Sequence, residues 1–234
     1  MAKHNYKLST DKRGELLHVR AVSNRLRDEY EETDLGNMDE SFSELVYIIL
    51  SVRTAEVCYQ RAYASLSQYI DGNWDKLLDL GEDKLAELIA DGGLADKKAR
   101  QILQIARSLD NGRGAISMAS YERLSTQELV DKLCEFEGIG VKVAKCITMY
   151  AMDRESFPID IHCARVGSRL GWYEKRTRYT RRYADLIEAA IPASRRHRLH
   201  INLIQHGREV CNAKEPDCER CCISSYCSYN NARA

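Results

Sequence analysis

The sequence predicts an all-α protein, and three observations support this fold class. Only three prolines occur in 234 residues, so few positions interrupt a helix. The helix-favouring residues Leu, Ala, Glu, Lys and Arg dominate the composition. Apolar residues recur at spacings of three and four along most of the chain, while the alternation that is typical of strands is rare.

Helices are expected wherever this spacing is sustained, and glycine, proline and capping residues set their ends. In chain order the expected helical ranges are 43–50, 55–66, 74–80, 82–94, 94–109, 126–152, 161–172, 183–192 and 197–211. Gly92 and Gly93 end the fourth of them. The range 126–152 is expected to be two helices around a tight turn at Gly138–Gly140. Pro158 ends an extended linker, and Asp160 begins the next helix.

Four cysteines near the C-terminus are spaced C-x6-C-x2-C-x5-C, at Cys211, Cys218, Cys221 and Cys227. Thiolates gathered in one short loop, without a neighbouring histidine pair, suit a [4Fe–4S] cluster, because each iron corner takes one cysteine. Zinc stays open as an alternative, although structural zinc sites usually show two close pairs and only one is present here. A disulfide framework is a third reading, opposed by the odd total of nine cysteines.

The remaining five cysteines are interpreted separately. Cys222 adjoins an expected ligand and is therefore an alternative ligand. The other four fall in apolar helical segments and are expected to be buried small hydrophobic residues: Cys58, Cys134, Cys146 and Cys163.

The charge is unevenly distributed although the net charge is zero. Residues 161–234 hold 14 of the 35 Lys and Arg residues but only 7 of the 35 Asp and Glu residues. This basic C-terminal segment can hold a phosphate backbone. The alternative interpretation is that its charges lie on a solvated helix face. The basic residues and the tyrosines interleaved with them are Arg176, Arg178, Arg181, Arg182, Arg195, Arg196, Arg198, Tyr173, Tyr179 and Tyr183.

No apolar run reaches the length of a membrane span, and the polar start MAKHNYKLSTDKR lacks the apolar region of a signal peptide. We therefore expect a soluble protein of the cytoplasm, a reducing compartment in which thiolates survive.

The segment EFEGIGVKVAKC carries the first candidate functional residues. Gly138 and Gly140 let the backbone turn sharply, and Ile139 is expected to anchor the turn in the core. Amides at the start of the following helix can then hold a DNA phosphate without reading the base sequence. Lys142, two residues after Gly140, could contact a phosphate or take part in catalysis.

A catalytic role for Lys142 is favoured by Asp160, which lies eighteen residues later at the start of a helix. A partly desolvated lysine in the first turn of a helix has a lowered pKa, and its neutral amine can attack C1′ of a deoxyribose. Asp160 could stabilise cationic sugar character and accept protons. It also suits the simpler role of a helix N-cap, and the two roles are compatible.

From Ser43 to Cys227 the chain resembles the endonuclease III family, the helix-hairpin-helix DNA glycosylases with a [4Fe–4S] cluster. The resemblance rests on ILSVRTAE, GLADKKARQI, GIGVKVA, IDIH, HGREVC and the cysteine loop. It implies a six-helix barrel with the hairpin over residues 39–154. It also implies a second domain, an N-terminal helix plus the cluster region, over residues 1–38 and 155–234. DNA with an extrahelical base would lie in the cleft between these domains.

Roles follow from the resemblance by position. Lys142 matches the Schiff-base lysine, Asp160 the essential aspartate, and the four spaced cysteines the cluster ligands. Arg53 and Leu94 occupy places where the family inserts side chains into the base stack. Together with the hairpin residues Gly138, Ile139 and Gly140, they would bind double-stranded DNA that contains a damaged or modified base. The protein is expected to act as a monomer near the nucleoid and away from membranes.

Several residues depart from the family pattern. Glu137 stands where proline is usual, and Val141 replaces a common basic residue. Glu215 and Asp217 add negative charge between the first two cysteines, and these four changes weaken DNA affinity. Arg53 replaces the glutamine of the bacterial enzyme. Residues 1–42 are also longer than usual and acidic at DEYEETD.

The leading hypothesis is a bifunctional DNA glycosylase and abasic-site lyase of base excision repair that acts on damaged or modified pyrimidines. A monofunctional glycosylase for mismatched or alkylated bases is the first alternative, which Lys142 opposes. A catalytically silent iron–sulfur protein that binds DNA is the second, which the intact pair of Lys142 and Asp160 opposes.

Overall fold

The computed structural model describes residues 6–30 and 36–232, so part of the acidic DEYEETD stretch lies outside the described residues. The α-helices are α1 (Val19–Glu29), α2 (Ser41–Ser51), α3 (Glu56–Ile70), α4 (Glu82–Leu88), α5 (Ala95–Ser108), α6 (Ala119–Glu122), α7 (Thr126–Cys134), α8 (Val141–Tyr150), α9 (Ile161–Arg169), α10 (Arg181–Ala189), α11 (Arg196–Glu209) and α12 (Ser228–Asn231). Short 3-10 helices are η1 (Trp74–Leu77), η2 (Ala90–Gly92), η3 (Ala193–Arg195) and η4 (Ser224–Tyr226). β-Pairing in the described ranges is limited to isolated bridges, so the all-α prediction is confirmed.

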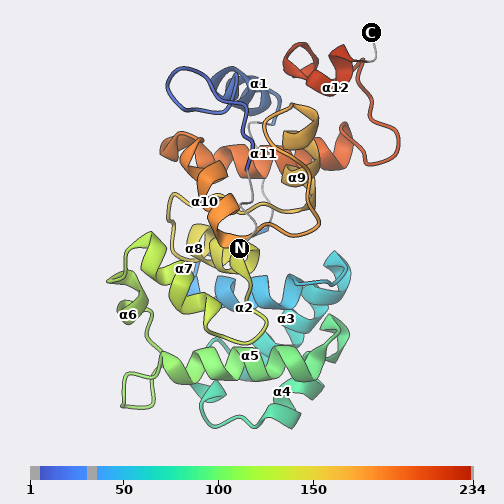
Figure 1. Cartoon of the computed structure of the whole chain (residues 1–234). Coiled ribbons are helices and arrows are strands. Elements are labelled where there is room, and N and C mark those ends of the chain that lie inside the picture. Colours follow the sequence, from blue (N-terminus) through green and yellow to red (C-terminus); the bar gives the residue numbers. More distant parts are fainter. Residues whose placement is uncertain (1–5, 31–35, 233–234) are drawn as a thin grey trace. The chain divides into compact units, whose positions relative to one another are not determined.

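The chain divides into two compact units (Figure 1). The central unit comprises residues 36–154. The terminal unit joins residues 1–35 to residues 155–234, so its two pieces come from opposite ends of the chain.

The central unit is built around α2, which packs against α3, α5 and α8 (Figure 1). Every residue from Phe42 to Leu50 is buried, because a helix that is apolar nearly all round must be covered on every side. A buried carboxylate at the start of this helix, Glu44, accepts hydrogen bonds from Met38 N and Asn37 Nδ2, both at 2.6 Å. These bonds fix the chain's entry into the helix.

The terminal unit is built around α11, which packs against α1 and α9. The segment that precedes α1 lies along the C-terminal half of the chain. Ser9 N donates to Trp172 O at 3.0 Å, and Leu16 N donates to Ala190 O at 2.8 Å. Residues 9–16 are therefore an integral part of this unit.

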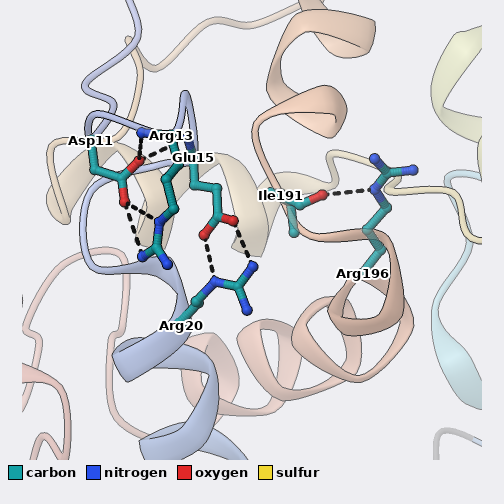
Figure 2. A network of polar contacts seen from close by, with 6 residues as sticks. All are labelled: Asp11, Arg13, Glu15, Arg20, Ile191 and Arg196. Carbon is teal, nitrogen blue, oxygen red and sulfur yellow. Dashed lines mark hydrogen bonds and ion pairs between the residues drawn. The ribbon is translucent and has the colours of Figure 1, made fainter.

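Side chains reinforce the same segment (Figure 2). The Arg20 guanidinium donates to both oxygens of Glu15, at 2.6 and 2.7 Å, and Asp11 accepts from the amides of Arg13 and Glu15. The paired charges lie near the surface, where solvent weakens the attraction between them. These contacts set the path of the segment more than they stabilise the unit.

The observed helices depart from the expected ranges in small ways. The helix expected over 161–172 ends at Arg169, because Gly171 takes a left-handed conformation with φ of 81°. One-turn elements such as α6 and α12 were not expected, since a single turn is too short to show periodicity. No helix among the described residues is long and apolar enough to cross a membrane.

Candidate functional site

The helix-hairpin-helix turn connects α7 to α8. Gly138 has φ of 81°, Ile139 is buried in the core, and Gly140 is the N-cap of α8 in an extended conformation. No side chain caps α8, and its first turn contains no acidic residue. The first amides of α8 are therefore not masked by a local carboxylate, as an anion-binding turn requires.

A neighbouring helix holds this turn in place. Gln101 on α5 donates from Nε2 to Glu137 O at 2.5 Å. A Cβ atom at Gly138 would lie 2.2 Å from the same Nε2 and 2.8 Å from Lys97 Cε. The left-handed φ favours glycine at position 138, and a Cβ there would displace the ends of the Gln101 and Lys97 side chains.

Lys142 is the second residue of α8 and its side chain is exposed. An exposed amine in the first turn of a helix is accessible to a large substrate. Glu137, which departs from the family pattern, is exposed as well.

Arg53 and Leu94 share an unusual backbone conformation. Both are non-glycine residues with φ of 54°, in the left-handed region that disfavours a Cβ. Arg53 is exposed, and Leu94 is 54% exposed, which is uncommon for a large apolar side chain. Two turns of the central unit therefore present side chains to solvent from strained positions.

Lys98 is a candidate residue that sequence reasoning missed. It is buried in the central unit, and its ammonium group is bonded to the turns that carry Arg53 and Leu94. The sequence does indicate that Lys98 is buried, because its spacing places it on the same face of α5 as the buried residues Ile102 and Ile105. In the sequence it looks like half of an ordinary surface pair, Lys97–Lys98.

Asp160 lies in the terminal unit as the N-cap of α9. Its Oδ1 accepts a hydrogen bond from Cys163 N at 2.7 Å, and the residue is half-buried. The linker before it is fixed by Glu188, whose Oε2 accepts from Ser156 Oγ at 3.0 Å and from Phe157 N at 2.5 Å. The capping role expected of Asp160 is present, and it holds the carboxylate in one place.

The four spaced cysteines of the terminal unit line one pocket. This pocket encloses about 280 Å³ of space between protein atoms, part of it open to solvent. Its lining residues are Arg169, Val210, Cys211, Pro216, Asp217, Cys218, Cys221, Ser224, Cys227, Tyr229 and Asn230. Cys222 is not among them.

The thiols of this pocket are free and are not gathered around one point. The structure shows no disulfide among the nine cysteines, all of which lie in the described ranges, and this opposes the disulfide reading. In the described part of the chain, no three His, Cys, Asp or Glu side chains are arranged to hold a metal ion. A tetrahedral zinc site needs its ligands around a single ion, whereas a cluster takes one cysteine at each of several corners. Both arrangements use four thiolates, and the four spaced cysteines line one pocket.

Burial disfavours the thiolate form of two neighbouring cysteines of the loop, one inside the pocket and one outside it. It raises the pKa of Cys221 to about 12 and that of Cys222 to about 11. Cys146 and Cys163 are buried, as expected for small hydrophobic residues, while Cys58 and Cys134 are only half-buried.

Two arginines of α9 hold the start of the cysteine loop. Arg165 donates from Nε to Cys211 O at 2.8 Å and from Nη2 to Gly207 O at 2.7 Å. Arg169 donates to Cys211 Sγ at 3.1 Å and to Asn212 O at 2.6 Å. The helix that begins at Asp160 is thus bonded directly to the first cysteine of the set.

Most arginines of the basic run make contacts inside the terminal unit. Arg176 stacks on Tyr183, with 4.9 Å from Cζ to the ring centroid, and Arg196 donates to Ile191 O at 3.1 Å (Figure 2). Arg181, Arg195 and Arg198 also bond within the unit. The tyrosines Tyr173, Tyr179 and Tyr183 pack on one another. Exposed basic residues of the run are Arg178 and Arg182.

The chain matches one protein family over most of its length. The family model of the HhH-GPD superfamily of base excision DNA repair proteins matches residues 46–189. A putative DNA glycosylase of Arabidopsis thaliana is 34% identical over 171 residues, which are 73% of this chain and 58% of that relative. Endonuclease III of Sulfolobus acidocaldarius is 27% identical over 195 residues, which are 83% of this chain and 84% of that relative.

Solved structures show the same fold. A trapped covalent intermediate of endonuclease III with DNA has a TM-score of 0.74 at 20% identity, over 92% of this chain and 97% of that chain. A thermostable thymine-DNA glycosylase has a TM-score of 0.71 at 16% identity, with the same coverage of both chains. The chain therefore belongs to the HhH-GPD superfamily of base excision DNA repair proteins.

Proposed function

We propose that this base excision repair protein is a bifunctional DNA glycosylase and abasic-site lyase that removes damaged or modified pyrimidines from double-stranded DNA. One observation carries the proposal: an exposed lysine, Lys142, follows directly on a glycine turn whose amides suit a phosphate. A phosphate held at this turn brings the adjoining sugar close to the Lys142 amine. The protein acts as a monomer in the cytoplasm.

Lys142 is the nucleophile in the proposed reaction. The extruded nucleotide presents C1′ to the neutral amine, whose lone pair forms the new C–N bond. The bond between C1′ and the base breaks, and its electron pair leaves with the base, which takes up a proton. Opening of the sugar ring then gives an imine, and loss of a proton from C2′ expels the 3′ phosphate oxygen. The strand is cut on the 3′ side by this β-elimination.

Asp160 is the acid–base partner in this proposal. As a carboxylate it stabilises positive charge that develops on the sugar, and it accepts a proton that the attacking amine must lose. Its bond from Cys163 N supports this role, because a carboxylate held by a helix amide reorganises little during reaction.

Binding of DNA is assigned to three turns of the central unit. Amides of the hairpin at Gly138–Gly140 hold one phosphate, and Arg53 and Leu94 enter the base stack where the nucleotide leaves it. Their exposure and their strained backbone support this assignment, since such strain is common at sites that clamp a ligand.

The cysteine loop is proposed to hold a [4Fe–4S] cluster through Cys211, Cys218, Cys221 and Cys227. These residues fit the group, because all four line one pocket and Arg169 donates to the first sulfur. A bound cluster supplies cross-links between the four segments of the loop. Arg165 and Arg169 then keep the loop in register with α9, whose first turn carries Asp160.

The proposal is tested by measuring base release and strand cleavage on a panel of labelled duplexes. The panel contains an abasic site, a thymine glycol, a uracil, a 5-methylcytosine and an undamaged control. Release of one pyrimidine together with strand cleavage supports the proposal and names the substrate class. Base release with uncut strands points instead to a monofunctional glycosylase. Tight binding without either product points to a silent DNA-binding protein.

A further inference from the structure

Lys98, on α5, is a buried charged side chain with a full set of partners. It is 2% exposed, and its ammonium nitrogen donates to Leu50 O at 2.6 Å, to Thr54 Oγ1 at 2.6 Å and to Gly92 O at 2.7 Å. Three oxygen acceptors use all three N–H groups. No carboxylate is among these partners, so the positive charge is held by dipoles alone.

The three partners belong to two separate turns. Leu50 and Thr54 flank the turn after α2 that carries Arg53, whereas Gly92 lies at the end of η2 and two residues before Leu94. The Thr54 hydroxyl also lies 2.6 Å from Gly92 O, so it joins the two turns a second time. Lys98 and Thr54 together form a polar bridge between the turns.

Both turns need such support, because each holds a non-glycine residue in the left-handed region. This conformation is strained at both Arg53 and Leu94, because each carries a Cβ. Strain of this kind persists only where the surrounding structure determines the backbone. The bonds from Lys98 end at the carbonyls and the hydroxyl that define the two turns.

Burial of a charge is an expensive way to join two turns. It lowers the pKa of Lys98 to about 8, while the three oxygen partners favour the charged form. A methionine of similar length would fill the same space without this cost. The ammonium group, unlike a methionine side chain, fixes the relative positions of Leu50 O, Thr54 Oγ1 and Gly92 O.

We propose that Lys98 is a positioning residue, which sets the spacing of the Arg53 and Leu94 turns so that both side chains enter the base stack together. This inference rests on the proposed function, in which those two side chains open the stack. Lys98 itself touches no DNA and acts only through the turns.

The test is a double-mutant cycle read by base stacking. The probe is a duplex with a tetrahydrofuran abasic analogue and 2-aminopurine in the opposite strand, which brightens when the stack opens. Lys98→Met is measured in the unchanged chain and in the Arg53→Ala, Leu94→Ala background. We expect Lys98→Met to weaken probe binding about tenfold and to reduce the brightening in the unchanged chain, with little further effect in the background.

An equal loss in both backgrounds, or no loss in the unchanged chain, would overturn the inference. A role limited to stability lowers the melting temperature but gives additive losses, so non-additivity separates the two. Lys84→Met, at a half-buried lysine of α4 that pairs with Glu87, is the matched control and should leave both readouts unchanged. If Lys98→Met does not fold, Thr54→Val removes the second arm of the bridge at a half-buried site and is expected to show the same pattern.

The same cycle separates this inference from the proposed function. If the Arg53→Ala, Leu94→Ala variant opens the stack to the same extent as the unchanged chain, the assigned roles of both turns are wrong. The role inferred for Lys98 is then wrong as well. If that chain fails to open the stack while Lys98→Met has no effect or an additive one, only the inference about Lys98 falls.

Discussion

The hairpin of the central unit and the cysteine loop of the terminal unit are held in different ways. The hairpin is formed by packing and hydrogen bonds within the chain: Ile139 is buried, Gln101 bonds to Glu137 O, and Gly138 fits against α5. The cysteine loop has short one-turn helices and depends on arginines at its start. Its four spaced thiols line a pocket.

This difference indicates which part of the site is complete in the chain alone. The segment that carries Lys142 has its backbone determined by residues of the central unit. In the proposed arrangement, the cysteine loop of the terminal unit is completed by a cluster bound at the four thiols that line its pocket.

Loss of one proposed cluster ligand has the largest expected effect. Cys218→Ala should remove the visible absorbance and most of the bound iron, and it should expose residues 211–227 to proteolysis. Cys222→Ala is the matched control, because Cys222 lies next to a ligand but outside the pocket lining. The two variants are compared by absorbance and iron content. Equal spectra from both would contradict the ligand assignment.

A methyl group at the hairpin turn should be costly without any metal being involved. Gly138→Ala meets Gln101 Nε2 at 2.2 Å and takes a φ of 81°, so we expect a loss of about 2–5 kcal/mol of unfolding free energy. Gly112→Ala has nearly the same φ, 78°, with nothing within 4 Å, and should cost about 1–2 kcal/mol. Urea unfolding measures both, and equal losses would show that α5 does not hold the turn.

The pH dependence of stability should reveal the buried charge of Lys98. Burial lowers its pKa from the usual 10.5 to about 8 in the folded chain. Between these two pH values the unfolded chain binds more protons, so the unfolding free energy rises with pH, by at most about 3 kcal/mol. Lys98→Met should remove this rise when the difference between the two chains is followed across the window. A difference that stays constant would mean that Lys98 titrates normally.

The smallest expected effect concerns the capping box of α7, the first helix of the hairpin. Ser125 Oγ accepts from Glu128 N at 3.3 Å, and Glu128 Oε2 accepts from Ser125 N at 2.8 Å. Ser125→Ala should cost about 1 kcal/mol of unfolding free energy. The absorbance of the cysteine loop should not change, because the two regions are held independently. A spectrum that changed with this variant would remove the contrast between them.

Local patterns allowed much of the site to be anticipated from the sequence. Periodicity located the main helices, the two glycines located the hairpin turn, and the uneven spacing of four cysteines located a pocket. Each of these features depends on residues that are close in the chain. Asp160 as an N-cap belongs to the same class, since a cap bonds to the amide three residues on.

Features that depend on distant residues could not be anticipated. The bridge from Leu8 to Tyr173 joins segments that share no local pattern, and Lys98 bonds to Leu50 across 48 residues. The basic run was interpreted as a surface that meets phosphate, but Arg176 and Arg196 hold their own unit. A sequence records that arginines are present, and only the fold decides whether they face solvent or a neighbouring carbonyl.

The most direct test of the account is borohydride trapping on an abasic duplex, followed by peptide mapping. Borohydride reduces an imine to a stable amine, so a true intermediate becomes a covalent link between protein and DNA. The account predicts a cross-link on the peptide that contains Lys142, absent in Lys142→Gln, with duplex binding of that variant nearly unchanged. A cross-link on another residue, or trapping that survives in Lys142→Gln, would contradict the assignment of Lys142 as the nucleophile.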